Sequence, residues 1–138
     1  MKEIIIFGTG KIAEVIHYYA HHECSYKVAA FTTDAAYLPD GEVFLDKKVV
    51  AFQEVTNHYP PSQYDMFVAI GYHDLNKLRE TKCQEARDKG YNLVSIIPTS
   101  TALPSNVVYG DNCFIMPPSL IHPCVTIGNN VFVWNGAM

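Results

Sequence analysis

The residues best suited to chemistry form a glycine-containing turn near the start of the chain. Gly8, Thr9, Gly10 and Lys11 open a segment, residues 8–13, that matches the pattern G-x-G-x-x-G/A. The pattern follows a predicted strand and opens a predicted helix, which is the context in which it binds phosphate. Glycines let the backbone approach a phosphate closely, and a helix N-terminus presents unpaired N–H groups and a partial positive charge. The turn therefore predicts a phosphate-bearing ligand, with Lys11 as a nearby cation. The alternative is that the glycines only form a tight turn.

Two further groups of candidate ligand contacts follow other predicted strands. Asp34 comes just after the second strand, where a Rossmann fold places a carboxylate on a ribose hydroxyl. Gly71, Tyr72 and His73 come after the third strand. Ligands of open α/β sheets bind beyond the carboxyl ends of the strands, so these residues are expected at one edge with Gly8 and Gly10. For His73 the alternative is an incidental loop histidine.

The elements that must position these residues alternate along the first 97 residues. We expect strands at residues 3–7, 26–31, 65–70 and 92–97, with a short one at 49–50. Helices are expected at residues 11–22, 52–58 and 74–89, the last ended by Gly90. The last helix carries the polar residues Asn76, Lys77 and Arg79 near the same edge. The alternative for all three is a solvated helix face, and for Lys77 that is the expectation. Alternating strands and helices predict a parallel α/β sheet.

The last third of the chain repeats every six residues. Large apolar or aromatic residues stand at one phase: Leu103, Tyr109, Ile115, Ile121, Ile127 and Val133. Small or β-branched residues stand four positions later: Val107, Cys113, Ser119, Val125, Val131 and Ala137. This period fits neither a helix nor a simple strand and is typical of a parallel β-helix. We expect two domains, residues 1–97 and 98–138, packed directly on each other because almost no linker separates them.

Composition excludes several classes of function. The 138 residues carry a net charge of −4 with no basic run, so nucleic acid is not an expected partner. No apolar stretch approaches the roughly 20 residues that a membrane span needs, and the N-terminus lacks a signal-peptide layout, so a cytoplasmic protein is expected. The four cysteines have no metal-ligand spacing, and no metal site is expected. Cys113 is expected to be a buried free thiol.

The number of strands bears on the identity of the phosphate ligand. A full dinucleotide fold needs two halves with six strands in all. The sequence offers four clear strands and one or two weak ones, which favours a mononucleotide-type ligand over NAD.

Together these segments resemble the sugar O-/N-acyltransferases of the hexapeptide-repeat superfamily, related to sialic acid O-acyltransferase and nucleotide-sugar N-acetyltransferases. The resemblance covers the whole chain and is carried by residues 4–11, 68–72 and 76–80 and by the repeats from Leu103. It implies a Rossmann-like N-terminal domain followed by the first coils of a left-handed parallel β-helix, assembled as a trimer. It also implies that Thr9, Gly10, Lys11, Asp34 and Gly71 contact the nucleotide part of an activated sugar.

The family's activity is transfer of an acyl group from acetyl-CoA to a hydroxyl or amine of a nucleotide-linked sugar, in glycan or surface-polysaccharide synthesis. In the family a histidine of the β-helix acts as general base, a role that suits imidazole. By this resemblance the histidine is expected beyond Met138, and His122 is expected to be a surface residue. Residues 103–138 supply about two coils of three six-residue sides. The chain is therefore expected to be a truncated form that self-associates through its coils and is inactive alone.

Two alternatives remain open on the sequence. One is a module that binds a nucleotide or nucleotide-sugar without catalysis. The other is a small NAD-dependent oxidoreductase that uses the glycine turn for its cofactor, although such enzymes do not carry hexapeptide coils.

Overall fold

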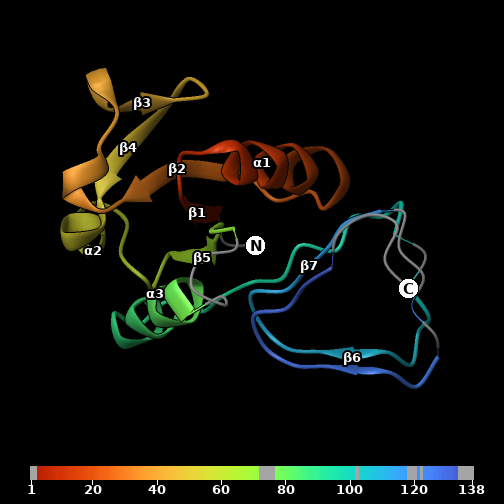
Figure 1. Cartoon of the computed structure of the whole chain (residues 1–138). Coiled ribbons are helices and arrows are strands. Elements are labelled where there is room, and N and C mark those ends of the chain that lie inside the picture. Colours follow the sequence, from red (N-terminus) through yellow and green to blue (C-terminus); the bar gives the residue numbers. More distant parts are fainter. Residues whose placement is uncertain (1–2, 72–76, 102, 118–120, 122, 134–138) are drawn as a thin grey trace.

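The computed structural model describes residues 3–71, 77–101, 103–117, 121 and 123–133. A five-stranded sheet with helices on both faces forms the N-terminal part, and a stack of coils lies beside it (Figure 1). The sheet order is β3-β4-β2-β1-β5. Its strands are β1 (Glu3–Phe7), β2 (Val28–Thr33), β3 (Val43–Phe44), β4 (Lys47–Ala51) and β5 (Tyr64–Val68). All neighbours pair in parallel except β3, which runs antiparallel to β4.

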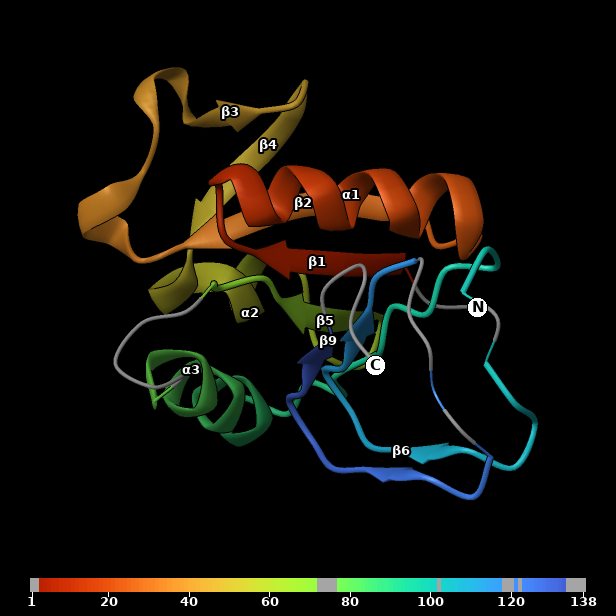
Figure 2. The ribbon, with the colours of Figure 1, turned by 45° about the vertical axis from the view of Figure 1, so that its right-hand side comes forward.

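The helices cover the sheet as the apolar residues of its strands require. Helix α1 (Lys11–Glu23) lies on one face, and α2 (Val55–His58) and α3 (Lys77–Asp88) lie on the other (Figure 2). Short 3-10 turns η1 (Ala35–Tyr37), η2 (Asp40–Glu42) and η3 (Phe52–Glu54) complete the connections. Strand β1 is buried on both sides because successive side chains alternate: Ile4 and Ile6 pack with α1, and Ile5 and Phe7 pack on the other face.

Several strand predictions differ from the structure. The third strand, predicted at residues 65–70, spans Tyr64–Val68, and the short strand predicted at 49–50 spans Lys47–Ala51. The second strand begins and ends two residues later than predicted, because the Tyr26 N–H still bonds the carbonyl of Ala20 in α1. The strand predicted at residues 92–97 is wrong. That segment makes only isolated bridges, Leu93 to Met66 in the sheet and Ile96 to Phe114 in the coils. The segment is apolar because it crosses from the sheet core to the coil core. The sequence pattern alone cannot distinguish such a crossing segment from a strand.

The coils have the period that the repeats predict. Strand β6 (Val108–Tyr109) pairs in parallel with β8 (Thr126–Ile127), and β7 (Phe114–Ile115) pairs with β9 (Phe132–Val133). Each partner lies 18 residues further along the chain, which equals three six-residue sides of one coil. Nine of the twelve repeat positions pack inside the coils: Leu103, Val107, Cys113, Ile115, Ile121, Val125, Ile127, Val131 and Val133. Ser119 and Ala137 lie outside the described residues.

Tyr109 is the exception among the described repeat positions, because its side chain does not pack inside the coils. It is 44% exposed and lines a surface hollow with Tyr26 and Ser95. A phenol carries a hydroxyl that an apolar coil interior would leave without a partner, so the ring faces water. Cys113, by contrast, is a fully buried free thiol as predicted.

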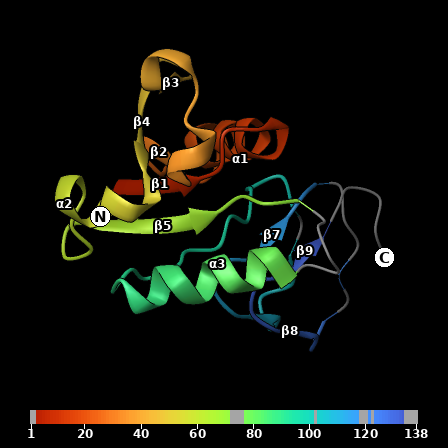
Figure 3. The same ribbon diagram turned by 60° about the vertical axis from the view of Figure 1, so that its left-hand side comes forward.

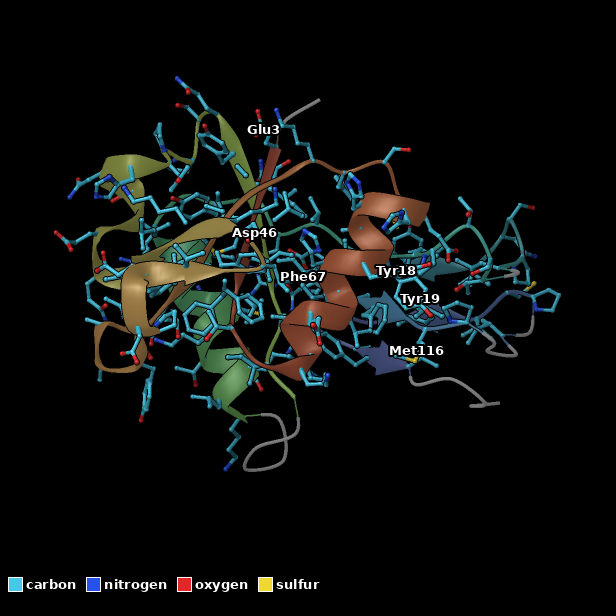
Figure 4. All side chains as sticks on the ribbon, turned by 90° about the horizontal axis from the view of Figure 1, so that it is seen from above. Glu3, Tyr18, Tyr19, Asp46, Phe67 and Met116 are labelled. Carbon is cyan, nitrogen blue, oxygen red and sulfur yellow. The ribbon has the colours of Figure 1, made fainter. Side chains whose placement is uncertain are left out.

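The coils pack directly on the sheet, as the short linker predicts. Phe114 and Phe132 of β7 and β9 join the core beneath α1. Phe132 stacks on Phe67 of β5 with ring centroids 5.7 Å apart, and Phe114 lies 5.9 Å from Tyr19 of α1. Figure 3 shows β7 and β9 beside α3 and β5, and Figure 4 shows Tyr19 on the side of α1 that faces the coils.

A buried asparagine joins the two parts through the backbone of β5. Asn112 is fully buried, accepts a hydrogen bond from the Val68 N–H at 2.7 Å and donates to the Val68 carbonyl at 3.2 Å. Its amide thus pairs with the end of β5 as another strand would. Its φ of 53° is a conformation that asparagine tolerates better than most residues.

A buried arginine makes a second junction. Arg79 of α3 is 2% exposed, and its guanidinium donates to the Asn130 side-chain oxygen at 2.8 Å and to the Ile70 carbonyl at 3.1 Å. It also lies 3.7 Å from the centre of the Phe132 ring. Of the two interpretations left open for Arg79, the solvated face is therefore excluded, whereas Lys77 is exposed as predicted. Asn76 lies outside the described residues.

We expect Asn112→Gly to lower the free energy of unfolding by about 2–4 kcal/mol, since two buried backbone groups of Val68 lose their partners. Glycine accepts the positive φ, so backbone strain adds little. Urea denaturation measures the change. The matched control is Asn106→Gly, at an exposed turn where the side chain accepts a hydrogen bond from the Cys124 N–H. An equal loss in both variants would contradict a special role for Asn112.

Cys83 predicts a loss of stability at alkaline pH. Burial raises the pKa of this α3 thiol from 9.0 to about 12, so the folded chain keeps a proton that the unfolded chain releases. Its contribution is complete below pH 9 and is lost as the pH rises toward 12. Between pH 9 and pH 10.5 we expect the free energy of unfolding of Cys83→Ala to fall by about 2 kcal/mol less than that of the wild type, since the variant lacks this thiol. Cys124→Ala, at an exposed turn, should keep the wild-type pH dependence under reducing conditions.

Candidate functional site

The candidate site lies where the four parallel strands end. Gly8 follows β1, Asp34 follows β2, Phe52 follows β4 and Ala69 follows β5. Because the strands are parallel, these positions share one edge of the sheet, which is the edge where ligands of α/β folds bind. The N-terminus of α1 and the middle of α3 reach the same edge through their contacts with Gly8 and Asp34.

Gly8 is required by the backbone at this edge. Its φ is 124°, and a Cβ there would lie 2.7 Å from the carbonyl oxygen of Ala69. The Gly8 N–H bonds the Thr32 carbonyl at 2.8 Å, while the Ala69 N–H bonds the Phe7 carbonyl at 2.8 Å. This glycine therefore lets β5 continue close against the end of β1, and it turns the chain toward α1.

Gly10 has a different role, because nothing in the fold requires it to be glycine. It is the N-cap of α1 with an extended backbone, and a Cβ there would meet no described heavy atom within 4 Å. The helix has no side-chain cap, so its first N–H groups are available to an external acceptor. Open space in front of uncapped amides is the arrangement that accommodates a phosphate.

The two side chains of the turn differ in their surroundings. Thr9 is half-buried between the two glycines. Lys11 is exposed and pairs with Glu14 of α1 at 3.0 Å. This exposed pair contributes little to stability, and it partly offsets the positive charge that Lys11 was predicted to add.

Asp34 is held by two side chains at the end of β2. Lys82 of α3 donates to Asp34 Oδ1 at 2.8 Å, and Gln53 Nε2 donates to the same oxygen at 3.4 Å. The Gln53 Oε1 atom in turn accepts a hydrogen bond from the Ala35 N–H at 3.1 Å. The carboxylate is therefore in the predicted place, and its orientation is fixed from the α3 side of the sheet.

Lys82 is a largely buried cation with two carboxylate partners. Its side chain is 10% exposed, and Nζ also bonds Glu85 at 2.9 Å. The ammonium lies 4.8 Å from the centre of the Phe52 ring and 5.3 Å from that of Phe7. Burial opposes protonation, but the hydrogen bonds to Asp34 and Glu85 outweigh it, and the pKa of Lys82 lies above its usual value. Lys82 stays charged throughout the neutral range.

The predicted contacts after the third strand are described in part. Gly71 lies against the start of α1, since a Cβ there would be 3.5 Å from Ile12 Cγ1. It therefore reaches the edge that holds Gly8 and Gly10. Tyr72 and His73 lie outside the described residues, as does His122 of the coils.

Sequence reasoning missed Lys82 and Gln53. A signal for Lys82 was present, because Arg79, Lys82, Cys83 and Ala86 share the helical spacing of a buried stripe. Two cations on the buried face of a helix need acidic or carbonyl partners, and Asp34 was the carboxylate already placed at that edge. For Gln53 no comparable signal exists in the sequence.

Other features of the described residues do not compete with this edge. An open depression of about 890 Å³ is lined by residues of α3 and by Asn129 and Asn130 of the coils, and no residue of the glycine turn lines it. The described residues include no group of three histidine, cysteine or acidic side chains that could bind a metal ion. None of the described helices is long and apolar enough to cross a membrane.

Comparison with known proteins identifies the repeat. Residues 106–138 match the family model of the bacterial transferase hexapeptide (six repeats). No curated protein matches the chain in sequence.

Solved structures match almost the whole chain. Perosamine N-acetyltransferase from Caulobacter crescentus, in complex with CoA and GDP-perosamine, is 26% identical over 99% of this chain and 61% of its own, with a TM-score of 0.84. The acetyltransferase domain of PglB from Neisseria gonorrhoeae, in complex with acetyl coenzyme A, is 16% identical over 99% of this chain and 64% of its own, with a TM-score of 0.80. At that identity the second match shows the fold alone.

The chain spans about three-fifths of the length of these neighbours. The repeat match and the neighbours together support the left-handed β-helix acyltransferase fold that the six-residue period indicates. The predicted resemblance is thereby confirmed: the chain is similar to the hexapeptide-repeat sugar acyltransferases, with a matching repeat segment and sugar N-acetyltransferases as structural neighbours.

Proposed function

We propose that this chain is the nucleotide-binding part and the first coils of an enzyme that transfers an acetyl group from acetyl-CoA to a nucleotide-linked sugar. The observation that carries the proposal is the structural match, over 99% of the chain at 26% identity, to an enzyme solved with CoA and GDP-perosamine. The N-terminal part acts as a Rossmann-like nucleotide-sugar domain, and the coils belong to the acetyl-CoA site of a homotrimer.

The carboxyl edge of the sheet supplies the nucleotide contacts in this proposal. The diphosphate lies over Gly10 and the uncapped amides of α1, where the fold leaves open space. Asp34 accepts hydrogen bonds from the ribose hydroxyls. Gly8 shapes the turn, and Thr9, Lys11, Gly71, Tyr72 and His73 border the same ligand. The sugar then extends from the diphosphate toward the acyl donor.

The reaction needs no cofactor beyond the acyl donor. An amine or hydroxyl of the sugar attacks the thioester carbonyl carbon, the new C–N or C–O bond forms, and the C–S bond breaks. The proton lost by the nucleophile passes through a general base to the departing thiolate of CoA. We assign no general base among the described residues, whose part in the reaction is to bind and orient the nucleotide-sugar.

Calorimetry with the chain of residues 1–138 tests the proposed ligand class. We expect GDP or UDP to bind and NAD not to bind, with dTDP, CMP and acetyl-CoA completing the panel. Binding of NAD in preference to the mononucleotides would instead favour the oxidoreductase alternative. Acetyl transfer by a longer form that contains the remaining coils separates the enzyme from a binding module.

Gly10→Ala tests the placement of the phosphates. Since a Cβ at Gly10 meets nothing in the fold, we expect a loss of about 1 kcal/mol or less in stability, the cost of alanine at an N-cap. Nucleotide affinity should fall at least tenfold, because the methyl group occupies the space of the phosphate. Gly128→Ala is the matched control, since a Cβ at that exposed coil position also meets nothing within 4 Å. Unchanged nucleotide affinity in Gly10→Ala would place the ligand elsewhere.

A further inference from the structure

The Lys82 ammonium lies close to the carboxyl ends of three strands, although Lys82 is not part of the glycine turn. Phe7 ends β1, Asp34 follows β2 and Phe52 follows β4, and the Lys82 ammonium lies within 5.3 Å of all three groups. Its own helix places it on a buried stripe with Arg79, Cys83 and Ala86. A cation in this position has been desolvated by the fold and needs compensation.

The contacts of Lys82 compensate its buried charge, but stability alone does not explain why this position holds a lysine. A buried ion pair contributes little net stability compared with well-packed apolar side chains of similar volume. Methionine or leucine could fill the space between Phe7 and Phe52. The lysine therefore has its main effect on Asp34, the carboxylate that faces the candidate nucleotide site.

The two carboxylate oxygens of Asp34 have different surroundings. Lys82 and Gln53 both bind Oδ1, and Oδ2 accepts no hydrogen bond from any described residue. The Asp34 side chain is 29% exposed, so Oδ2 can reach a ligand. Without Lys82 the carboxylate could rotate, and Oδ2 would no longer be held toward the ligand.

We propose that Lys82 is a positioning residue of this edge: through Asp34 Oδ1 it fixes the carboxylate so that Oδ2 accepts hydrogen bonds from the ribose hydroxyls of a ribonucleotide-linked sugar. The inference rests on the proposed function and deepens it, because it makes recognition depend on ribose hydroxyls as well as on phosphate. Lys82 itself touches Asp34 rather than the ligand.

Paired ligands that differ only at the ribose test this role. UDP and GDP are each compared by calorimetry with their 2′,3′-dideoxy analogues, which lack both hydroxyls. In the wild-type chain we expect about tenfold tighter binding of the ribonucleotide, the effect of one hydrogen bond to a charged acceptor. Lys82→Met should lower the affinity for UDP or GDP to the level of the dideoxy analogue, whose own affinity stays unchanged. Asp34→Asn should do the same, and Lys82→Arg should restore most of the difference.

Controls separate positioning from other roles of Lys82. Lys77→Met removes an exposed lysine from the same helix and should leave all affinities unchanged. Lys82→Gln gives the same comparison if Lys82→Met does not fold in a urea titration. Equal weakening of the ribonucleotide and its dideoxy analogue would overturn the inference, as would no change in either. If the wild-type chain binds neither UDP nor GDP, the proposed function itself fails, and that result is visible before any variant is made.

Discussion

The hydrogen bonds between Asn112 and the backbone of Val68 connect the two parts of the molecule at the point on which the candidate site depends. Val68 is the last residue of β5, and the next residue, Ala69, bonds Phe7 and limits Gly8 to glycine. A coil side chain thus holds the end of β5, which in turn holds the end of β1 and the start of the glycine turn. Asn112, Val68 and Ala69 are buried and hydrogen-bonded, so none of them can move alone without leaving a polar group unpaired.

The same junction explains why the coils begin beside the sheet instead of at the end of a linker. Ile96 pairs with Phe114, which pairs with Phe132, and each step is 18 residues. The aromatic side chains of the last two face the sheet core, while Cys113 and Ile115 face the coil interior. One side of the coil stack therefore contributes to two cores, which explains why Phe114 and Phe132, between the repeat positions, are apolar.

The sequence allowed prediction of features that depend on local pattern. Strand β1, helix α1 and the coil period follow from the distribution of apolar residues, and the turn at Gly8 from its glycines. Features that depend on tertiary partners were not predictable. Leu93 and Ile96 look like one strand although they pair with different parts of the fold. Tyr109 shares its phase with residues that pack inside the coils, yet it is exposed. The sequence left Arg79 open between a ligand contact and a solvated face, whereas it is buried. The pairing of Asp34 with Lys82 joins residues 48 positions apart, which no local pattern records.

The two buried cations of α3 show how one helix serves both parts of the fold. Arg79 directs a planar guanidinium at a carbonyl and an amide oxygen of two different segments, geometry that a lysine ammonium could not match. Lys82, one turn further along, is a compact charge between carboxylates and aromatic rings. Arg79 and Lys82 lie on the same helix. The hydrogen bonds of Arg79 to the coil residue Asn130 therefore help to set the position of Lys82 beside Asp34. The orientation of a carboxylate at the sheet edge is thereby tied to the docking of the coils, so the candidate site and the coil stack form one structural unit.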